Sequence, residues 1–256
     1  MPYTDEQWEY FKKWENYNEE KDKEYSLGQF NFILERIKNN NPLSVVRFGE
    51  GESRIVLKEQ TLNRTELSYN PSIEKNNNYV VDLENVAKIN HKNYFVGIQS
   101  YTYRPGEKDR PLDEFIKQRE FVMELGNLPK TQYTCSRVFC NNYKLCNTVL
   151  LDAVKDREIY FVSSAGSSPS KLLHKHNFKK HWGIHSKDAW KTNQSMYEEI
   201  KNELINKKDC VLICCAGFFG NILISKLNHD NNFYLNVGSV YDPTILGKTT
   251  RGYHRK

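Results

Sequence analysis

The sequence lacks several features that would place the protein in a special class. It has no run of about 18 apolar residues, so no transmembrane helix is predicted. Residues 1–23 are polar, acidic and aromatic, which argues against a secretory signal peptide. The chain contains no Gly-x-x-x-x-Gly-Lys-Ser/Thr phosphate loop, no Gly-x-Gly-x-x-Gly turn and no Gly-x-Ser-x-Gly elbow. These absences disfavour P-loop nucleotide hydrolysis, dinucleotide binding and serine-dependent hydrolysis.

Paired cysteines and concentrated charge are also missing. The six cysteines form no Cys-x-x-Cys pair, and Cys210, Cys214 and Cys215 flank or lie within an apolar run. This usage is typical of reduced, buried thiols in a cytoplasmic protein, and the spacing of Cys135 and Cys140 does not suit a zinc site. The net charge of +5 suits an anionic small molecule. The lysines are scattered, so nucleic acid is not an expected partner.

Short apolar runs alternate with helical patterns along the chain. Continuous rather than alternating apolar strands indicate a mostly parallel sheet with helices on both faces, so the expected fold class is α/β, with one domain as the simplest count. The expected strands are 43–48, 93–98, 158–162, 210–215 and 233–238, with shorter extended pieces at 134–139 and 183–185. The expected helices are in 1–40, 53–58, 79–90, 111–125, 141–154, 190–206 and 222–227, with another beginning at Lys171.

The chain is organised around residues 44–53, Ser-Val-Val-Arg-Phe-Gly-Glu-Gly-Glu-Ser. The first expected strand ends here in two glycines interleaved with Glu50 and Glu52, at the sheet edge where ligands bind in open α/β folds. Residues two apart in an extended segment project to the same side. Because the two carboxylates would repel each other, we expect a positive partner, either Arg47 or a divalent metal. A solvated acidic turn is the equally weighted alternative.

Two further strand-to-helix loops, 163–169 and 216–221, are rich in small residues. Backbone N–H groups at a helix N-terminus favour phosphate, so Ser164, Gly166 and Gly217 are candidate ligand contacts. Tight packing of helix on sheet is the alternative explanation for each loop. The four histidines between residues 174 and 185 have mixed spacing in a lysine-rich segment, and we interpret them as surface residues.

The last expected strand leads to Gly238, Ser239 and Asp242. A carboxylate at Asp242 would face the same edge of the sheet as the two glutamates, although an Asp-Pro turn that caps its own backbone explains it equally well. Arg251 and Tyr253 follow, and they either fold back over this edge or belong to a loose tail.

These motifs carry a resemblance to a known family. The run from Val46 to Glu52 resembles the Arg-Phe-Gly-Asp-Gly-Glu motif of the GT-D fold glycosyltransferases, formerly a domain of unknown function. The run from Val211 to Gly220 and the segment from Tyr234 to Asp242 are similar to its far end, so the resemblance covers about residues 28–253. It implies a single Rossmann-like domain of the GT-D type at 28–256, preceded by a helical extension at 1–27.

The resemblance also implies an activity: metal-dependent transfer of a sugar from a nucleotide diphosphate sugar, expected to be a UDP-sugar, to a glycan or glycoconjugate acceptor. Mn²⁺ or Mg²⁺ would be held by Glu52, which matches the motif, and by Glu50, which stands where the family has Asp. Asp242 is the third candidate catalytic residue. The expected substrate contacts are Arg47, Gly49, Gly51, Ser164, Gly166, Gly217, Gly238, Ser239 and Arg251.

A non-catalytic nucleotide- or phosphate-binding module on the same scaffold is the alternative function. The basic tail leaves peripheral contact with a membrane surface open, and the sequence also leaves open a homo-oligomer.

Overall fold

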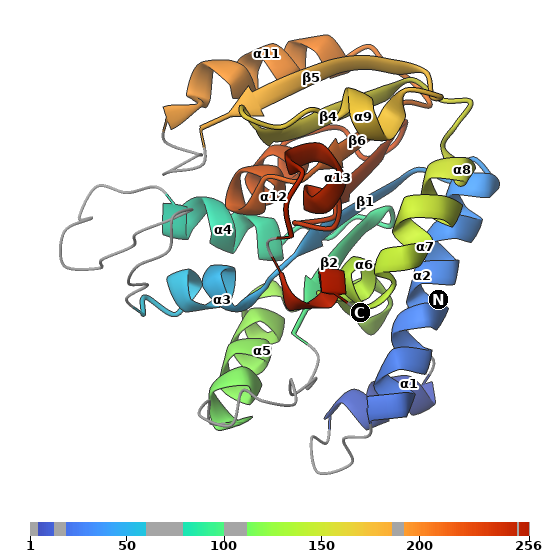
Figure 1. The fold of residues 1–256 in the computed structure, drawn as a ribbon. Helices are drawn as coiled ribbons and strands as arrows, with labels where there is room; N and C mark the ends of the chain where they lie inside the picture. Colours follow the sequence, from blue (N-terminus) through green and yellow to red (C-terminus); the bar gives the residue numbers. More distant parts are fainter. Residues whose placement is uncertain are drawn as a thin grey trace.

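The protein is built on one seven-stranded sheet. The computed structural model describes residues 5–12, 19–59, 79–99, 112–185, 192–249 and 251–255. All neighbouring strands are parallel, and their order is β3-β2-β1-β7-β6-β4-β5 (Figure 1). The strands are β1 (Leu43–Arg47), β2 (Tyr94–Ile98), β3 (Tyr133–Cys135), β4 (Ile159–Ser164), β5 (Phe178–Ile184), β6 (Val211–Cys214) and β7 (Phe233–Asn236). The expected α/β class with a parallel sheet is confirmed.

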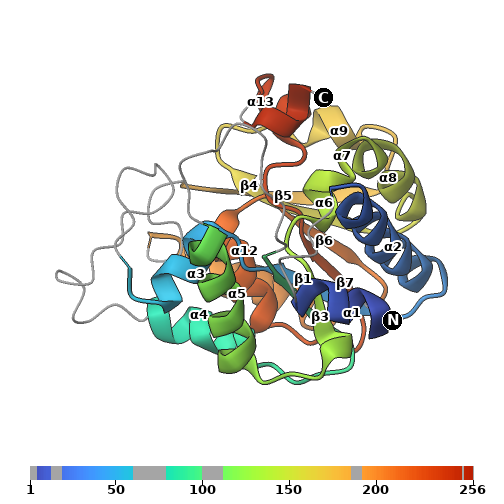
Figure 2. The ribbon, with the colours of Figure 1, turned by 90° about the horizontal axis from the view of Figure 1, so that it is seen from below.

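Helices cover both faces of this sheet, as Figure 2 shows. The first face carries α3 (Glu50–Val56), α4 (Tyr79–Ala87), α5 (Leu112–Gly126), α11 (Gln194–Leu204) and α12 (Gly217–Ser225). The second face carries α2 (Glu19–Lys38), α6 (Val138–Asn141), α7 (Tyr143–Leu145), α8 (Leu151–Ala153), α9 (Ser170–Leu173) and α13 (Asp242–Leu246), with a π-helical turn at Cys146–Leu150. The remaining elements are α1 (Asp5–Lys12), η2 (Lys130–Gln132) and η4 (Gly252–Arg255). None of the helices in the described residues combines the length and hydropathy needed to span a membrane.

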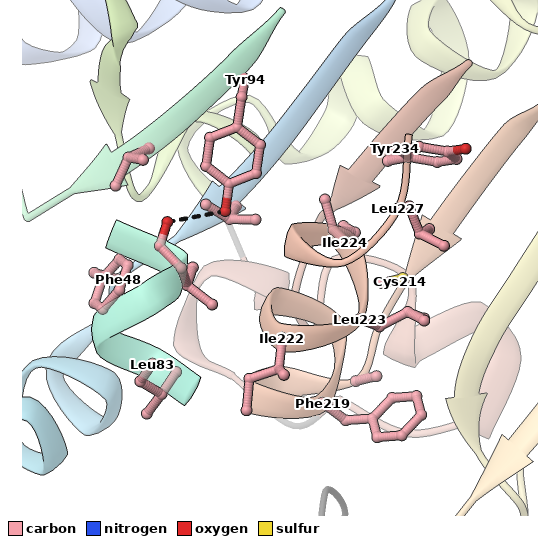
Figure 3. Packing of buried hydrophobic residues seen from close by; sticks show 14 of the residues in the cluster. Phe48, Leu83, Tyr94, Cys214, Phe219, Ile222, Leu223, Ile224, Leu227 and Tyr234 are labelled. Atoms are coloured by element: carbon pink, nitrogen blue, oxygen red, sulfur yellow. Dashed lines mark hydrogen bonds between the residues drawn. The ribbon is translucent and has the colours of Figure 1, made fainter. Parts of the chain in front are cut away.

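The core of the first face is centred on α12. Phe219, Ile222 and Leu223 on this helix are fully buried against the sheet (Figure 3). Tyr94 of β2 is also fully buried, and its hydroxyl donates to the backbone oxygen of Val86 on α4 at 3.0 Å. Because a buried phenol needs a hydrogen-bond partner, this bond fixes how α4 lies over the sheet.

Several boundaries differ from the sequence-based expectations. The helix after β1 begins at Glu50 instead of residue 53, and α12 begins at Gly217 instead of residue 222. The extended piece expected at 134–139 is divided between β3 and α6. The expected domain boundary between residues 27 and 28 falls within α2, and the division into an extension and a domain stays a prediction. The expected irregular stretch before Tyr79 and most of the loop at 99–110 lie outside the described residues.

The largest difference is at β5, where a seven-residue strand replaces the short extended piece expected at 183–185. This strand forms the edge of the sheet beside β4, so only Trp182 and Ile184 are buried in it. His181 lies within this strand and is half-buried, so the expectation that it is a surface residue is wrong. An edge strand is partly exposed, so it can contain charged residues such as Lys179 and Lys180. The segment therefore lacks the apolar run by which a strand is recognised in a sequence.

A buried histidine lies at the opposite, amino-terminal end of the sheet. His229 is 8% exposed, and its Nδ1 is 2.8 Å from the hydroxyl of Ser44 on β1. Its ring lies 4.8 Å from that of Tyr94 and 5.5 Å from that of His91, which itself contacts the carboxylate of Asp230. Burial, reinforced by His91, lowers the pKa of His229 from about 6.5 to about 4. The folded protein therefore holds this ring neutral at neutral pH.

This histidine makes folding sensitive to acid. Because the unfolded chain takes up the proton near pH 6.5 and the folded chain only near pH 4, the stabilisation is complete above the first value. It is lost progressively as the pH falls from the first value to the second, at a cost of up to about 3 kcal/mol. We expect urea unfolding of His229→Gln to depend less steeply on pH between about pH 7.5 and about pH 4.5 than unfolding of the wild type. The exposed His174 supplies the control, since His174→Gln should keep the wild-type slope; identical slopes in all three proteins would contradict the assignment.

Candidate functional site

The topology of the sheet marks one edge for ligand binding. After β1 the chain passes to α3 on the first face, and after β6 it passes to α12 on the same face. After β7, which lies between these two strands, the chain passes to α13 on the opposite face. Ligands in open α/β sheets bind outside the carboxyl ends of strands at such a switch point. The candidate site therefore lies at the carboxyl ends of β1, β7 and β6.

Two buried asparagines join the strand ends at this point. The β1–β7 pairing extends only to Val45 opposite Leu235, and beyond it the side chain of Asn221 on α12 takes the place of the neighbouring strand. Asn221 Oδ1 accepts from the backbone N–H of Arg47 at 2.9 Å, and its Nδ2 donates to the Arg47 carbonyl at 2.7 Å. Asn236 Nδ2 donates to Asn221 Oδ1 at 2.6 Å and to the carbonyl of Gly217 at 3.1 Å. We call Asn221 and Asn236 the amide pair.

The side chain of Arg47 turns toward β7. Its Nη1 donates to the carbonyl of Val237 at 3.0 Å and lies 3.6 Å from the sulfur of Cys140. A Cβ atom at Gly238 would approach the same Nη1 to 2.8 Å, and Gly238 has a φ of +65°. The backbone N–H of Gly238 donates to Oδ1 of Asn236 at 3.2 Å, so the amide pair also fixes the turn after β7. Close approach and left-handed backbone both require glycine here, and the guanidinium is held against the turn after β7.

Glu50 and Glu52 lie in the first turn of α3. Successive residues of an α-helix are rotated by about 100°, so residues two apart face in nearly opposite directions. The expectation that the two carboxylates project to one side is therefore wrong, because the strand has already given way to a helix. Glu50 Oε1 lies 3.5 Å from Nε of Arg54, and Glu52 Oε2 accepts from the N–H of Gly49 at 3.0 Å. Both carboxylates therefore stabilise the start of α3.

The same two side chains are oxygen donors of the kind that Mg²⁺ and Mn²⁺ prefer. Within the described part of the chain, no group of three or more His, Cys, Asp or Glu side chains is arranged to hold a metal ion. A carboxylate has about four lone-pair sites, so Glu52 can cap the helix and still ligate an ion. The carboxylate oxygens of these glutamates therefore suit a hard cation that takes most of its ligands from a bound substrate. Gly51, between them in the same helical turn, is buried.

The loop after β4 is fixed by a chain of hydroxyl groups. Ser167 donates to the carbonyl of Ser164 at 2.7 Å, so the 2.5 Å contact between Ser163 and Ser167 uses the hydrogen of Ser163. His181 Nε2, 2.9 Å from Ser163 Oγ, must then donate to that oxygen. Burial lowers the pKa of His181, so its ring is neutral. The histidine is a donor and not a base toward Ser163, which is itself 1% exposed, so this cluster is not an activated nucleophile.

Ser164 is the last residue of β4 and Gly166 lies in the loop after it, two strands away from β7, a separation of about 10 Å. The loop is joined to the β7 side because the N–H of Ser168 donates to the carbonyl of Ile245 on α13 at 2.8 Å. Gly166 is exposed, and a Cβ atom there would meet nothing within 4 Å. Its backbone is thus open to solvent beside the candidate site.

The turn after β7 gathers the remaining predicted residues. Asp242 is the first residue of α13, and its N–H donates to the carbonyl of Ser239 at 3.2 Å. Burial, together with the nearby carboxylate of Asp242, raises the pKa of Cys215 after β6. Arg251 Nε lies 3.4 Å from Ser239 Oγ, so the basic segment folds back against this turn and is not a loose tail there. Arg47, Gly238, Ser239, Asp242 and Arg251 are thus neighbours at one point of the sheet.

Sequence reasoning missed the residues that hold this arrangement together. The amide pair, Cys140 and His254 were not candidates, although each contacts a predicted residue. A signal for the amide pair is present in the sequence, since Asn221 and Asn236 each interrupt a buried apolar run, Phe-Phe-Gly-Asn-Ile-Leu-Ile and Phe-Tyr-Leu-Asn-Val. An amide in such a run needs specific polar partners. The contacts of Cys140 and His254 have no comparable signature.

Comparison with known proteins identifies the fold. No protein-family model and no curated protein matches the sequence. A solved structure described with the words "The highly conserved domain of unknown function 1792 has a distinct glycosyltransferase fold" matches this one with a TM-score of 0.62, over 82% of this chain and 77% of that chain. The chain has this glycosyltransferase fold. The resemblance of the sequence to the GT-D fold is confirmed at the level of the fold, at 16% sequence identity.

The packing of Arg47 on Gly238 in this glycosyltransferase fold can be tested with two glycines. Gly238 and Gly247 have similar φ values of +65° and +70°, but a Cβ atom at Gly247 would meet nothing within 4 Å. We expect Gly247→Ala to lower the free energy of unfolding by about 1 kcal/mol, the cost of left-handed backbone. Gly238→Ala should cost about 1 kcal/mol more, because the guanidinium must leave the Val237 carbonyl. Urea unfolding measures both; equal losses would contradict the packing described here.

Proposed function

We propose that the protein is a metal-dependent glycosyltransferase that uses a nucleotide diphosphate sugar, with a UDP-sugar as the expected donor and a glycan or glycoconjugate as the acceptor. The observation that carries the proposal is the position of Arg47. In a glycosyltransferase fold, its guanidinium is held at the switch point of the sheet, where the donor of such a protein is expected to bind.

The guanidinium of Arg47 suits the diphosphate of the donor. A guanidinium presents N–H groups in a planar fork that matches two phosphate oxygens, and it stays charged at every relevant pH. The bond to Val237 and the contact with Gly238 already order this side chain, so binding costs little further conformational entropy. Arg47 is half-buried, and its attraction for an anion is therefore screened less than that of an exposed arginine.

We propose Glu52 as the protein ligand of a Mn²⁺ or Mg²⁺ ion shared with the donor diphosphate, and Glu50 as a supporting carboxylate held by Arg54. When bound, the ion neutralises the charge that grows on the leaving nucleoside diphosphate. The N–H groups of the first turns of α3 and α12, including those of Gly51 and Gly217, and the loop with Ser164 and Gly166 are the proposed cradle of the nucleotide. Gly49, whose own N–H donates to Glu52, precedes α3 at this cradle.

The transfer itself breaks the bond between the anomeric carbon and the diphosphate oxygen, and the leaving nucleoside diphosphate keeps the electron pair. The acceptor hydroxyl forms the new bond to the anomeric carbon and loses its proton. We propose Asp242 as the carboxylate that binds the sugar or accepts this proton, since it begins α13 beside Ser239.

A donor screen tests the activity. We expect the purified protein, incubated with Mn²⁺, a panel of acceptor glycans and one nucleotide sugar at a time, to release free nucleoside diphosphate from one donor class. EDTA should stop the release. A non-catalytic binding module would show thermal stabilisation by a nucleotide without any release, and that outcome would replace the proposed activity.

Glu52→Gln tests the metal ligand separately from the fold. The amide keeps an oxygen that accepts the N–H of Gly49, so the melting temperature should stay close to that of the wild type. Because the charge that favours the cation is lost, we expect transfer to fall at least about a hundredfold. Glu198→Gln, an exposed carboxylate on α11, is the matched control and should keep full activity. Full transfer by Glu52→Gln would remove Glu52 from the site.

A further inference from the structure

The C-terminal segment returns to the candidate site, and the side chain of His254 contacts the site there. His254, in η4, has its Nε2 2.9 Å from the carbonyl oxygen of Ser239, in the turn that follows β7. Its ring also packs on that of Tyr143 in α7, with 5.2 Å between the centroids and 45° between the planes. The C-terminal segment, drawn in red in Figure 1, thus contacts elements from two distant parts of the chain. His254 is the residue common to these contacts.

The hydrogen bonds of His254 define the state of its ring. The backbone N–H of Arg251 donates to Nδ1 at 3.3 Å, so Nδ1 is the acceptor. Nε2 must then carry the hydrogen that is donated to the Ser239 carbonyl. One ring therefore joins the backbone at Arg251 to the backbone at Ser239, and it fixes where the Arg251 side chain begins.

Two guanidinium groups, those of Arg47 and Arg251, approach the turn after β7. Arg47 packs against Gly238, and Arg251 Nε lies 3.4 Å from Oγ of the next residue, Ser239. Asp242 contributes one carboxylate to this turn, so these three side chains sum to one net positive charge. Bringing two like charges to adjacent residues is unfavourable unless anionic groups offset them. The diphosphate of a nucleotide sugar carries more negative charge than the single positive charge that remains.

We infer that His254 is a positioning residue that holds Arg251 at the turn after β7, where the Arg251 guanidinium and that of Arg47 bind the donor diphosphate together. The inference rests on the proposed function and extends it to the C-terminal segment. His254 itself does not touch the donor. Its effect is on donor affinity, because it places a charge that the diphosphate uses and leaves the transfer step unchanged.

Three histidine variants test this role. His254→Leu removes both hydrogen bonds, whereas His254→Gln keeps an amide N–H that can donate to the Ser239 carbonyl. His174→Leu is the control, since His174 is exposed at the end of α9. We expect His254→Leu to raise the KM for the nucleotide sugar and the Kd for its nucleoside diphosphate with Mn²⁺ about tenfold, with kcat within about twofold of the wild type. His254→Gln should restore most of the affinity, and His174→Leu should match the wild type.

Trypsin cleavage after Arg251 gives a readout that does not depend on activity. His254→Leu should be cut there faster than the wild type, and Mn²⁺ with the nucleoside diphosphate should slow the cut in the wild type. Faster cutting with unchanged Kd and KM would overturn the inference and leave the proposed function standing. Loss of kcat with unchanged KM would also overturn it. A wild type that binds no nucleoside diphosphate would overturn the proposed function, and the inference with it.

Discussion

The hydrogen bonds between the side chain of Asn221 and the backbone of Arg47 are the interaction on which the rest of this site depends. Two central strands separate at their carboxyl ends, and the backbone N–H and C=O of the half-buried Arg47 no longer face a paired strand. A buried N–H or C=O without a partner is costly, so strands in a core rarely separate without a substitute. The primary amide of Asn221 offers one acceptor and one donor at the spacing of a strand backbone. Asn236 extends the network to Gly217 and Gly238. The end of β1, the start of α12 and the turn after β7 are therefore joined by one hydrogen-bond network.

This arrangement divides the charged residues into two groups with different roles. The arginines converge on the turn after β7, where backbone carbonyls and a glycine fix the guanidinium of Arg47. The glutamates lie in the first turn of α3, where they stabilise the helix through Gly49 and Arg54. The carboxylates of such a motif therefore have a structural role as well as the proposed chemical one. A single glutamate can serve both, since capping uses only part of its hydrogen-bonding capacity.

The sequence predicted the central strands well, because strands buried on both faces appear as continuous apolar runs, and β1, β6 and β7 are of this kind. It failed at β5, whose half-exposed residues resemble a surface segment. The helices α3 and α12 begin earlier in the structure than the sequence predicted. Gly49 and Gly217 resemble loop residues although they stand at the starts of these helices. The motif lies at the carboxyl end of β1, as predicted, but the sequence did not predict the direction of the Arg47 side chain. That direction depends on Val237, which is 190 residues further along the chain.

The position of β7 has a consequence for how the protein is made. This strand lies between β1 and β6, although it is the last to leave the ribosome. Without β7 the sheet would consist of two halves, β1 with β2 and β3 and β6 with β4 and β5, each with an open edge at the centre. Contacts of such long sequence separation form slowly, and unpaired strand edges attract other chains. β7 therefore joins the two halves, and a chain in which β7 is not yet paired presents two open strand edges.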